Sequence, residues 1–481
     1  MRQQPAQFAP FRQRMADEGL ADLFIAHFAH YYQKLLGGDD GLLRESDIRP
    51  VESLDNAERL SPHLARIGRA AVGRAVIIKL NGGLGTSMGL TGPKSLLVVK
   101  EGLTFLDIIA RQAIGIGAPL LLMNSFATDA QSLAVLGRYP QLQRDHLPLS
   151  FCQHKQPKVN ATDFSPAAWP DDPELEWCPP GHGDIYTALV TSGMLDRLLA
   201  AGYEYAFVSN ADNLGAVLDP GILGYMVDKR LPFLMEVADR TEADRKGGHL
   251  ARRPDGGLLL REIAQCPAGD MDAFQDIGRH RYFNTNNLWL HLPTLRDTLE
   301  ARDHELDLPM IRNRKTVDPR DPDSTPVYQL ETAMGSAIAV FRGAEAIRVP
   351  RVRFAPVKKT DDLLAVRSDA YLLTPDYGVV LDPARRGQPP GVELDAAYYR
   401  FVNDLDCCFP AGAPSLRDCD RLRVEGQFEF GPRVVLRGDV VLRNDPDQCL
   451  VVPAGLTLTD AVWPAEAVRP ANAVRTPCQT R

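Results

Sequence analysis

Residues 75–95 read AVIIKLNGGLGTSMGLTGPKS, and this stretch decides the interpretation of the whole chain. The mostly apolar run at residues 76–80 is typical of a buried strand that is too short to be a helix. Five glycines follow within eleven positions, so the next stretch must be a loop. Successive glycine amides can surround an anion, and Lys94 at the end of the loop supplies a positive charge for phosphate oxygens. The sequence therefore predicts a site for nucleotide phosphates.

The spacing of these glycines matches neither of two well-known phosphate loops. A Walker loop needs a lysine directly after its last glycine, whereas Pro93 separates Gly92 from Lys94. The dinucleotide fingerprint Gly-x-Gly-x-x-Gly, started at Gly83, would need a third glycine where this chain has Met88. The loop therefore indicates a different class of nucleotide site.

A series of motifs along residues 75–370 resembles the UDP-glucose pyrophosphorylase family of eukaryotic type. After the glycine loop the chain reads WCPPGHGD at 177–184, SNADNLG at 209–215, KGG at 246–248, FNTNNLW at 283–289 and FAPVK at 354–358. These stretches occur in the family's order, and several are long enough to be specific. The resemblance implies an α/β fold, a Rossmann-like (glycosyltransferase A-like) nucleotidyltransferase with a mixed, mostly parallel sheet.

The resemblance also implies a reaction, the transfer of a uridylyl group from UTP to glucose 1-phosphate with release of pyrophosphate. The attacking sugar phosphate is already an anion, so in-line attack on the α-phosphorus needs no general base and no covalent enzyme intermediate. The obstacle is the repulsion between two polyanions. Positioning and positive charge are therefore expected to supply nearly all of the catalysis.

Two lysines are the candidate catalytic cations. Lys94 ends the glycine loop, and the alternative is that it is an ordinary surface lysine. Lys358 follows the strand-like segment 352–354, and the resemblance implies that it contacts the UTP phosphates from the opposite side. Lys359 is expected to point away into solvent, because neighbours in an extended segment face opposite ways.

Asp212 is the candidate ligand for Mg²⁺, the expected cofactor. It follows the predicted strand at 205–208, where a carboxylate suits a hard cation that takes few protein oxygens. A turn-forming aspartate is the alternative. The sequence offers one such carboxylate, so it does not support a two-metal mechanism.

The remaining site residues are implied by the resemblance. The nucleotide is expected to contact Leu80, Asn81, Gly82, Gly83, Lys94, Gln153, Gly181, Asn210, Ala211, Asp212 and Lys358. The sugar phosphate is expected to contact His182, Lys246, Glu262, Asn284, Thr285 and Asn286. In this scheme Gln153 reads uracil and His182 contacts the sugar phosphate. Lys246 fits the tip of an exposed loop equally well.

Composition limits the partners of the chain. It has 481 residues, a formal net charge of −8 and a pI of about 5.7, which argues against a nucleic-acid-binding surface. Its 44% hydrophobic and 24% charged residues are those of an ordinary soluble protein. The sequence shows no membrane-spanning apolar run, no signal peptide at its start and no C-x-x-C pair. We therefore expect a cytoplasmic protein with small-molecule substrates and without nucleic-acid or membrane partners.

Three regions differ in pattern. Residues 1–70 read as an amphipathic helical segment that packs against the next domain. Residues 71–370 alternate short apolar runs with helical stretches, the pattern of a parallel sheet covered by helices. The candidate strands of this catalytic domain are 75–80, 119–123, 205–208 and 233–237. Residues 371–481 form a third region of different character.

Apolar residues in the third region recur every six positions. The two series are Phe428, Val434 and Val440, and Phe430, Leu436 and Leu442; after a two-residue insertion the step returns at 450, 456 and at 452, 458. This period predicts a left-handed parallel β-helix at about 420–460, with a two-sheet antiparallel unit as the alternative. Such a module suits subunit contact, so a homo-oligomer is possible. The tail after Asp460 shows no clear period.

Two other functions are alternatives. A UDP-N-acetylhexosamine pyrophosphorylase shares the chemistry and fold, but its loop typically has an arginine where this chain has Ser87. A non-catalytic nucleotide-binding scaffold would be expected to lack the phosphate cations or the metal carboxylate. Because Lys94, Lys358 and Asp212 are all present, the sequence favours an enzyme.

Overall fold

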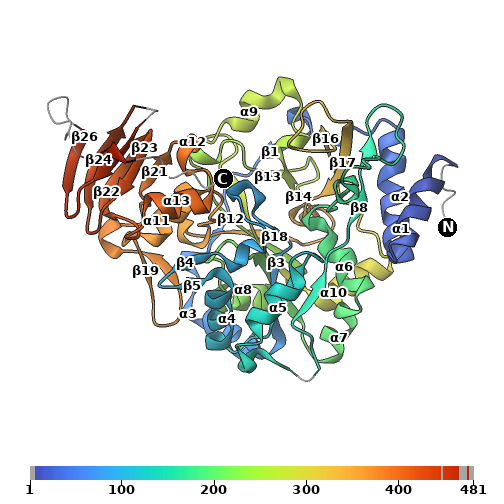
Figure 1. The fold of residues 1–481 in the computed structure, drawn as a ribbon. Helices are drawn as coiled ribbons and strands as arrows, with labels where there is room; N and C mark the ends of the chain where they lie inside the picture. Colours follow the sequence, from blue (N-terminus) through green and yellow to red (C-terminus); the bar gives the residue numbers. More distant parts are fainter. Residues whose placement is uncertain (1–5, 145, 446–447, 465–473, 476–481) are drawn as a thin grey trace.

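An eleven-stranded sheet forms the centre of the molecule (Figure 1). The computed structural model describes residues 6–144, 146–445, 448–464 and 474–475. The main path of the sheet runs in the order β2 (Asp55–Asn56), β18 (Glu345–Arg348), β12 (Phe233–Asp239), β15 (Tyr282–His291), β11 (Tyr205–Asn210), β3 (Ala75–Asn81), β6 (Leu120–Asn124) and β7 (Ser150–Cys152). The four predicted strands are confirmed as β3, β6, β11 and β12.

Four neighbouring strands run parallel, which places their carboxyl ends at one edge of the sheet. β11, β3, β6 and β7 pair in parallel, with Asn210 opposite Leu80 and Asn81 opposite Asn124. β15 runs antiparallel between β11 and β12, and β12 pairs in parallel with β18. The predicted mixed, mostly parallel α/β sheet is therefore confirmed. The loops that follow β3 and β11 leave the sheet side by side.

Helices cover both faces of the sheet because alternate strand residues point to opposite sides. Ile77 belongs to the core cluster of one face, and its neighbour Ile78 belongs to the cluster of the other. The first face carries α4 (Phe105–Ile116) and α8 (Pro220–Lys229), and the second carries α6 (Ile185–Thr191), α7 (Met194–Ala200) and α10 (Leu292–Glu300). Further elements are α5 (Asp129–Leu136), α9 (Met271–Gln275), β4 (Val98–Lys100), β5 (Leu103–Thr104), β8 (Gln156–Pro157), β10 (Trp177–Cys178), β13 (His249–Arg252), β14 (Leu258–Arg261), β19 (Tyr371–Leu373) and β20 (Val379–Leu381).

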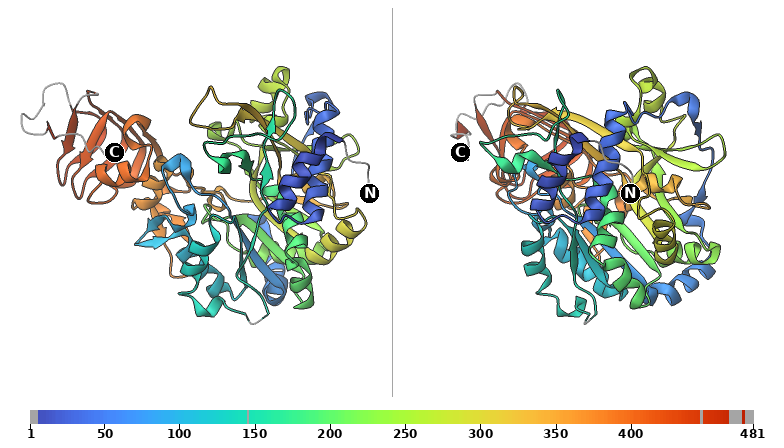
Figure 2. Two further views of the ribbon diagram at one scale, coloured as in Figure 1. Left: turned by 45° about the vertical axis from the view of Figure 1, so that its right-hand side comes forward. Right: turned by 90° about the vertical axis from the view of Figure 1, so that its right-hand side faces the viewer.

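The first two helices pack by their aromatic faces onto a small separate sheet (Figure 2). Phe24 and Phe28 share a buried cluster with Val159, Met310 and Leu330. The elements involved are α1 (Ala9–Asp17), α2 (Asp22–Leu36), β9 (Val159–Asn160), β16 (Met310–Thr316) and β17 (Pro326–Thr332). The predicted packing of amphipathic N-terminal helices against the following part of the chain is confirmed.

Residues 37–61 contain no α-helix, so the expectation of a helical segment across residues 1–70 is wrong there. This stretch contains single turns of 3-10 helix and two short strands, β1 (Arg49–Pro50) and β2. β1 pairs with β13, and β2 pairs with β18. Glycines at 37, 38 and 41 and Pro50 interrupt the helical pattern. The N-terminal region is thus joined directly to the central sheet.

The third helix, α3 (Pro62–Ala71), crosses α8 at a contact between two glycines. A Cβ atom at Gly68 would overlap the carbonyl oxygen of Pro220, and one at Gly224 would overlap the carbonyl oxygen of Leu64. The two helix backbones therefore touch where neither residue has a side chain. This close approach fixes α3 on the face of the sheet that α8 covers.

Parallel pairing also organises the C-terminal region. One sheet contains β21 (Gly391–Leu394), β22 (Ser415–Glu425), β24 (Val435–Arg443) and β26 (Thr457–Trp463), and a second contains β23 (Gln427–Phe430) and β25 (Cys449–Val452). Leu436 lies opposite Leu458, and Phe428 lies opposite Leu450, all of them buried. Residues of the six-residue series thus stack in successive turns of chain, which excludes the antiparallel alternative for these strands.

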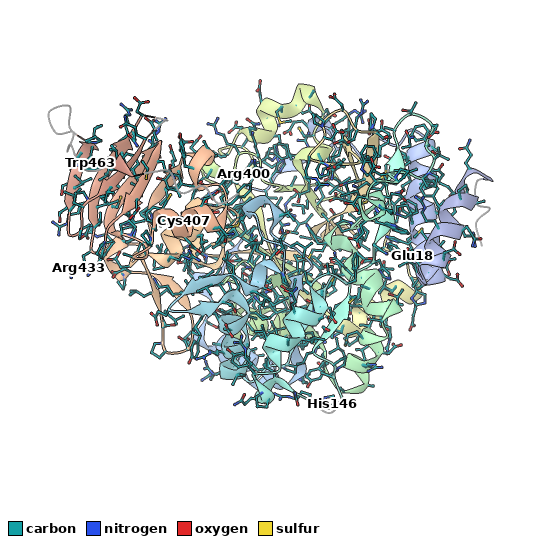
Figure 3. The ribbon with its side chains drawn as sticks, in the orientation of Figure 1. Glu18, His146, Arg400, Cys407, Arg433 and Trp463 are labelled. Atoms are coloured by element: carbon teal, nitrogen blue, oxygen red, sulfur yellow. The ribbon has the colours of Figure 1, made fainter. Side chains whose placement is uncertain are left out.

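The strands β21 to β26, which we call the C-terminal coils, project from one end of the molecule. Figure 3 shows Arg433 and Trp463 at the end opposite Glu18. Between the coils and the central sheet lie α11 (Thr360–Arg367), α12 (Ala396–Tyr399) and α13 (Val402–Cys408) (Figure 1). Most of the tail after Asp460 lies outside the described residues, apart from the end of β26 and β27 (Val474–Arg475), which pairs with β25. Within the described residues, no helix combines the length and apolar character needed to cross a membrane.

We predict that Gly68→Ala destabilises the protein by about 1–3 kcal/mol, because the new methyl group must push the backbones of α3 and α8 apart. Gly115→Ala, in α4, is the matched control, since a Cβ there meets no described atom within 4 Å. Thermal unfolding should show a lower Tm for Gly68→Ala and an unchanged or higher Tm for Gly115→Ala. Equal Tm values for both variants would contradict the close helix contact.

Candidate active site

A cavity of about 310 Å³ opens at the carboxyl ends of β3 and β11. Its lining residues are Leu80, Asn81, Gly82, Gly83, Lys94, Ser95, Gln153, Pro179, Gly181, His182, Asn210, Ala211 and Asp212. All of the predicted nucleotide contacts except Lys358 belong to this lining, together with His182 from the predicted sugar-phosphate contacts. Ser95 and Pro179 were not predicted. The parallel strands thus bring together motifs that lie more than 100 residues apart.

The glycine loop turns back on itself and carries Lys94 into the cavity. Gly85 and Gly89 have φ values of 63° and 76°, a left-handed conformation that glycine adopts without strain. The backbone N–H of Lys94 donates to the carbonyl oxygen of Gly83 over 3.1 Å. A Cβ atom at Gly82 would lie 2.7 Å from the carboxamide of Gln153. Glycine at position 82 therefore lets Gln153 approach the loop.

Lys94 and Asp212 meet in the cavity although 118 residues separate them. The Lys94 Nζ donates to Asp212 Oδ2 over 2.7 Å. The other carboxylate oxygen, Asp212 Oδ1, is buried and has no hydrogen-bond partner among the described residues. A buried, unpartnered carboxylate oxygen beside a phosphate loop fits a cation ligand, and Mg²⁺ takes few protein oxygens in such sites. The residues present therefore fit the expected metal.

His182 is held as a neutral imidazole. The backbone N–H of Met334 donates to its Nδ1 over 2.9 Å, so the ring proton lies on Nε2. Burial lowers the pKa of His182 to about 4. The side chain can therefore donate a hydrogen bond from Nε2 at neutral pH, but it adds no positive charge.

Three of the predicted sugar contacts, Asn284, Thr285 and Asn286, lie on β15 next to β11, outside the lining residues of the cavity. Asn284 and Asn286 are bonded to each other, since Asn284 Nδ2 donates to Asn286 Oδ1 over 2.8 Å and the Asn286 N–H donates to Asn284 Oδ1 over 2.9 Å. Asn286 has a φ of 57°, and the register of β12 against β15 shifts nearby. This irregularity lets the two asparagines form a compact pair at the sheet.

Thr285 is a correction to the predicted sugar contacts. Its side chain is buried, and its hydroxyl donates to the carbonyl oxygen of Glu236 over 2.7 Å. The same hydroxyl accepts from the backbone N–H of Asn287 over 3.4 Å. The hydroxyl therefore fastens β15 to β12 instead of facing a ligand.

Glu262 and Lys246 differ in their surroundings. Burial raises the pKa of the Glu262 carboxyl, and the positive charge of Lys358 partly offsets this effect. A Cβ atom at Gly248 would overlap the Glu262 carboxylate, so the KGG motif leaves room for it. Lys246 itself is exposed. Glu262 and Lys358 therefore lie close enough to interact, whereas no contact places Lys246 with them.

Lys358 is exposed, and its Nζ lies 5.8 Å from the centroid of the Phe354 ring. The expected strand at 352–354 is wrong, because Arg351–Arg353 forms a 3-10 turn. Lys359 is exposed, as expected, and Lys358 is exposed as well. The backbone N–H groups of residues 358 and 359 both donate to Asp362 Oδ2 at the start of α11. A helix cap, not an extended segment, sets the direction of Lys358.

Sequence reasoning missed a set of buried polar side chains behind the cavity. Lys79 is 2% exposed, and its Nζ donates to Ser209 Oγ over 2.8 Å and to the carbonyl oxygen of Ala216 over 2.7 Å. Burial lowers the pKa of Lys79 to about 7. Glu236, Asn213 and Arg353 are likewise buried. The signal that the sequence offers for this buried polar group is Lys79, a charged residue inside the apolar run at 76–80.

Comparisons with known proteins agree on one family. The family model described as UTP–glucose-1-phosphate uridylyltransferase matches residues 25–437. The enzyme of that name from Solanum tuberosum is 41% identical over 396 residues, covering 80% of this chain and 80% of that protein. The one from Saccharomyces cerevisiae is 40% identical over 397 residues, covering 81% and 78%. The UDP-glucose pyrophosphorylase of Leishmania major, solved in open and closed forms, aligns with a TM-score of 0.88 and 44% identity over 96% of this chain and 99% of that chain.

Lys79 leads to a prediction about pH. The unfolded lysine holds its proton up to a pKa near 10.5, whereas the folded one loses it near 7. Between these values the unfolded state binds more protons, so stability rises with pH by up to about 1.4 kcal/mol per unit. The difference in unfolding free energy between the natural chain and Lys79→Met should therefore grow in favour of the natural chain from pH 7 to 9 in denaturant titrations. A difference independent of pH would contradict the shifted pKa.

Proposed function

The chain belongs to the UTP–glucose-1-phosphate uridylyltransferase family, and we propose that its cavity performs this transfer by Mg²⁺-assisted in-line attack. The activity itself, formation of UDP-glucose from UTP and glucose 1-phosphate, is that of the family. The observation that carries the proposed mechanism is the contact of Lys94 with Asp212, 2.7 Å apart, at the meeting point of the glycine loop and the loop after β11. This contact supports a cation and a metal ligand at the position proposed for the nucleotide phosphates.

Positive charge is the main contribution of the chain to the reaction. Lys94 binds the phosphates that leave as pyrophosphate, and Lys358 reaches the UTP phosphates from the side of Glu262. Each preorganised cation stabilises charge that accumulates on phosphate oxygens in the transition state. Gly82 and Gly83 supply backbone N–H groups on the nucleotide side, and Gln153 reads the uracil. These roles follow the family resemblance at matching positions.

No cavity-lining side chain in the described structure is arranged as a general base. His182 accepts a backbone hydrogen bond at Nδ1 and carries its proton on Nε2, so it donates. Asp212 is paired with Lys94. The attacking sugar phosphate is an anion without proton transfer, so direct attack is consistent with these side chains. We therefore propose a single displacement with no covalent intermediate.

Asp212 would hold Mg²⁺ through Oδ1, the buried oxygen without a partner among the described residues. Bound Mg²⁺ would neutralise phosphate charge. Among the described residues no three or more His, Cys, Asp or Glu side chains group as a metal site. This supports a metal that takes most of its ligands from phosphate and water.

The sugar would lie against Glu262, Asn284 and Asn286. Asparagine offers a donor and an acceptor in a short side chain, which suits the alternating hydroxyls of a hexose. The relatives of known name use glucose 1-phosphate, which favours this substrate over an N-acetylhexosamine phosphate. The presence of Lys94, Lys358 and Asp212 argues against a non-catalytic scaffold.

Three further points extend the proposal beyond the cavity. We infer that the stacked C-terminal strands are sides of a left-handed parallel β-helix, because their six-residue series lies buried between parallel pairs. We propose a cytoplasmic location from the composition. Self-association through the coils remains a proposal, which light scattering of the purified chain tests directly.

Turnover with a panel of sugar 1-phosphates tests the proposed function. With UTP and Mg²⁺, pyrophosphate release should be fastest with glucose 1-phosphate and slow with N-acetylglucosamine 1-phosphate. Release that needs the N-acetylated sugar would favour the alternative enzyme. Absence of release with every sugar, from a folded protein that binds UTP, would favour a scaffold.

Asp212→Asn tests the metal ligand. The amide keeps the shape of the side chain but carries no charge, so the Mg²⁺ concentration for half-maximal rate should rise about tenfold or more. Asp418→Asn, which changes an exposed carboxylate of β22, is the control and should leave the Mg²⁺ titration unchanged. Superimposable titrations of Asp212→Asn and the natural chain would remove Asp212 from the metal site.

A further inference from the structure

A buried ion pair lies behind the cavity, between β12 and the chain that leads to Lys358. Glu236 is 0% exposed, and its carboxylate accepts four hydrogen bonds. Arg353 donates through Nε over 2.8 Å and through Nη2 over 2.6 Å, Asn287 Nδ2 donates over 3.1 Å, and Trp289 Nε1 donates over 2.9 Å. Buried charges are tolerated when every lone pair is used in this way. The bidentate geometry fixes the backbone at Arg353.

Asn213 joins this fixed point to the loop after β11. Its side chain is 1% exposed. Its Nδ2 donates to the carbonyl oxygen of Arg353 over 3.0 Å, and its Oδ1 accepts from the N–H of Ala355 over 3.1 Å. The Asn213 carboxamide thus bonds the backbone of the segment that leads to Lys358, on both sides of Phe354.

The residues next to this junction are those proposed for catalysis. Asp212 precedes Asn213, and its carbonyl oxygen accepts from the N–H of Val357 over 3.1 Å. Lys358 follows Val357 directly. The residue proposed as metal ligand therefore takes part in a hydrogen bond that connects the two segments, and the second lysine is one residue from it.

Glycine allows the same two segments to touch on the other side of Asn213. A Cβ atom at Gly215 would overlap the carbonyl oxygen of Val352. In addition, Arg353 Nη2 donates to the carbonyl oxygen of Val217 over 2.9 Å. Residues 212–217 are thus held against residues 352–357 along their whole length.

We propose that Asn213 is a positioning residue that sets the distance between Asp212 and Lys358. It contacts no substrate; it fastens the loop of the metal ligand to the segment of the second cation. The inference rests on the roles proposed above for Asp212 and Lys358. Loss of the carboxamide removes two of the hydrogen bonds between the segments and leaves the backbone bond of Asp212 with Val357, so the two charged groups can shift relative to each other. A displacement of about 1 Å at a reacting centre lowers rate up to about 100-fold.

A double-mutant cycle with Asn213→Ala and Lys358→Ala tests this inference. Asn213→Ala alone should lower kcat about 10- to 100-fold, with little change in the KM for UTP. In the Lys358→Ala background the same change should lower kcat less than about twofold, because the group that it positions is absent. Full additivity of the two losses would overturn the inference.

Controls separate positioning from folding. Asn444→Ala removes another carboxamide that donates to two backbone carbonyls, of Gln427 and Gln448, within the C-terminal coils. It should lower the Tm without lowering kcat. Asn213→Ser, whose short hydroxyl cannot reach both partners, replaces the alanine variant if that variant does not fold, and the same coupling is expected. Asn213 variants with unchanged kcat would overturn the inference.

The cycle also distinguishes the inference from the proposed function. If Lys358→Ala alone keeps full kcat, the lysine is not a catalytic cation, and both claims fail. If Lys358→Ala lowers kcat but the Asn213 loss is additive, the catalytic role stands and the positioning role fails.

Discussion

The contact between Lys94 and Asp212 is the interaction on which the architecture of the site depends. Opposite charges on two loops meet at 2.7 Å because β3 and β11 are adjacent, parallel and in register at their carboxyl ends. A chain with a net charge of −8 has no overall attraction for two polyanionic substrates. Local cations and glycine amides must therefore attract them within one cavity. The parallel sheet makes this possible, because it brings the loops that carry these cations and amides together at one edge.

Behind the cavity, the sheet carries polar groups that a structural core would not need. Lys79, Glu236 and Arg353 are buried, and each is hydrogen-bonded to the strands or to the loops that they support. Buried charges weaken folding unless their partners are well placed. These buried side chains fix the positions of two loops, because the loop of Asp212 and residues 353–357 are both bonded to them. Rigid support of this kind is typical of sites whose catalysis is electrostatic.

Much of the fold could be predicted from the sequence, because its signals are local. Apolar runs followed by polar or glycine-bearing residues predicted β3, β6, β11 and β12, and the six-residue period predicted the stacked C-terminal strands. The helical expectation failed at residues 37–61, where glycines and Pro50 interrupt the helical pattern and two short strands pair with distant ones. The strand expected at 352–354 failed because the cap of α11 and the ion pair of Arg353 control that segment.

The candidate site also divides into residues that local motifs predict and residues whose positions depend on long-range contacts. Motif order located the cavity-lining residues, since each motif is continuous in sequence. Thr285 was misplaced because the direction of a strand residue depends on register, and Asn213 was missed because its partners lie about 140 residues away. Long-range hydrogen bonds leave no pattern in a single sequence.

The stereochemical course at the α-phosphorus tests the central claim most directly. The substrate is UTP in which sulfur replaces one non-bridging α-oxygen in a single configuration, with glucose 1-phosphate as the acceptor. Direct attack by the sugar phosphate predicts an inverted configuration in the UDP-glucose analogue, because one displacement gives one inversion. Retention of configuration would require two displacements through a covalent enzyme intermediate, and it would contradict this account.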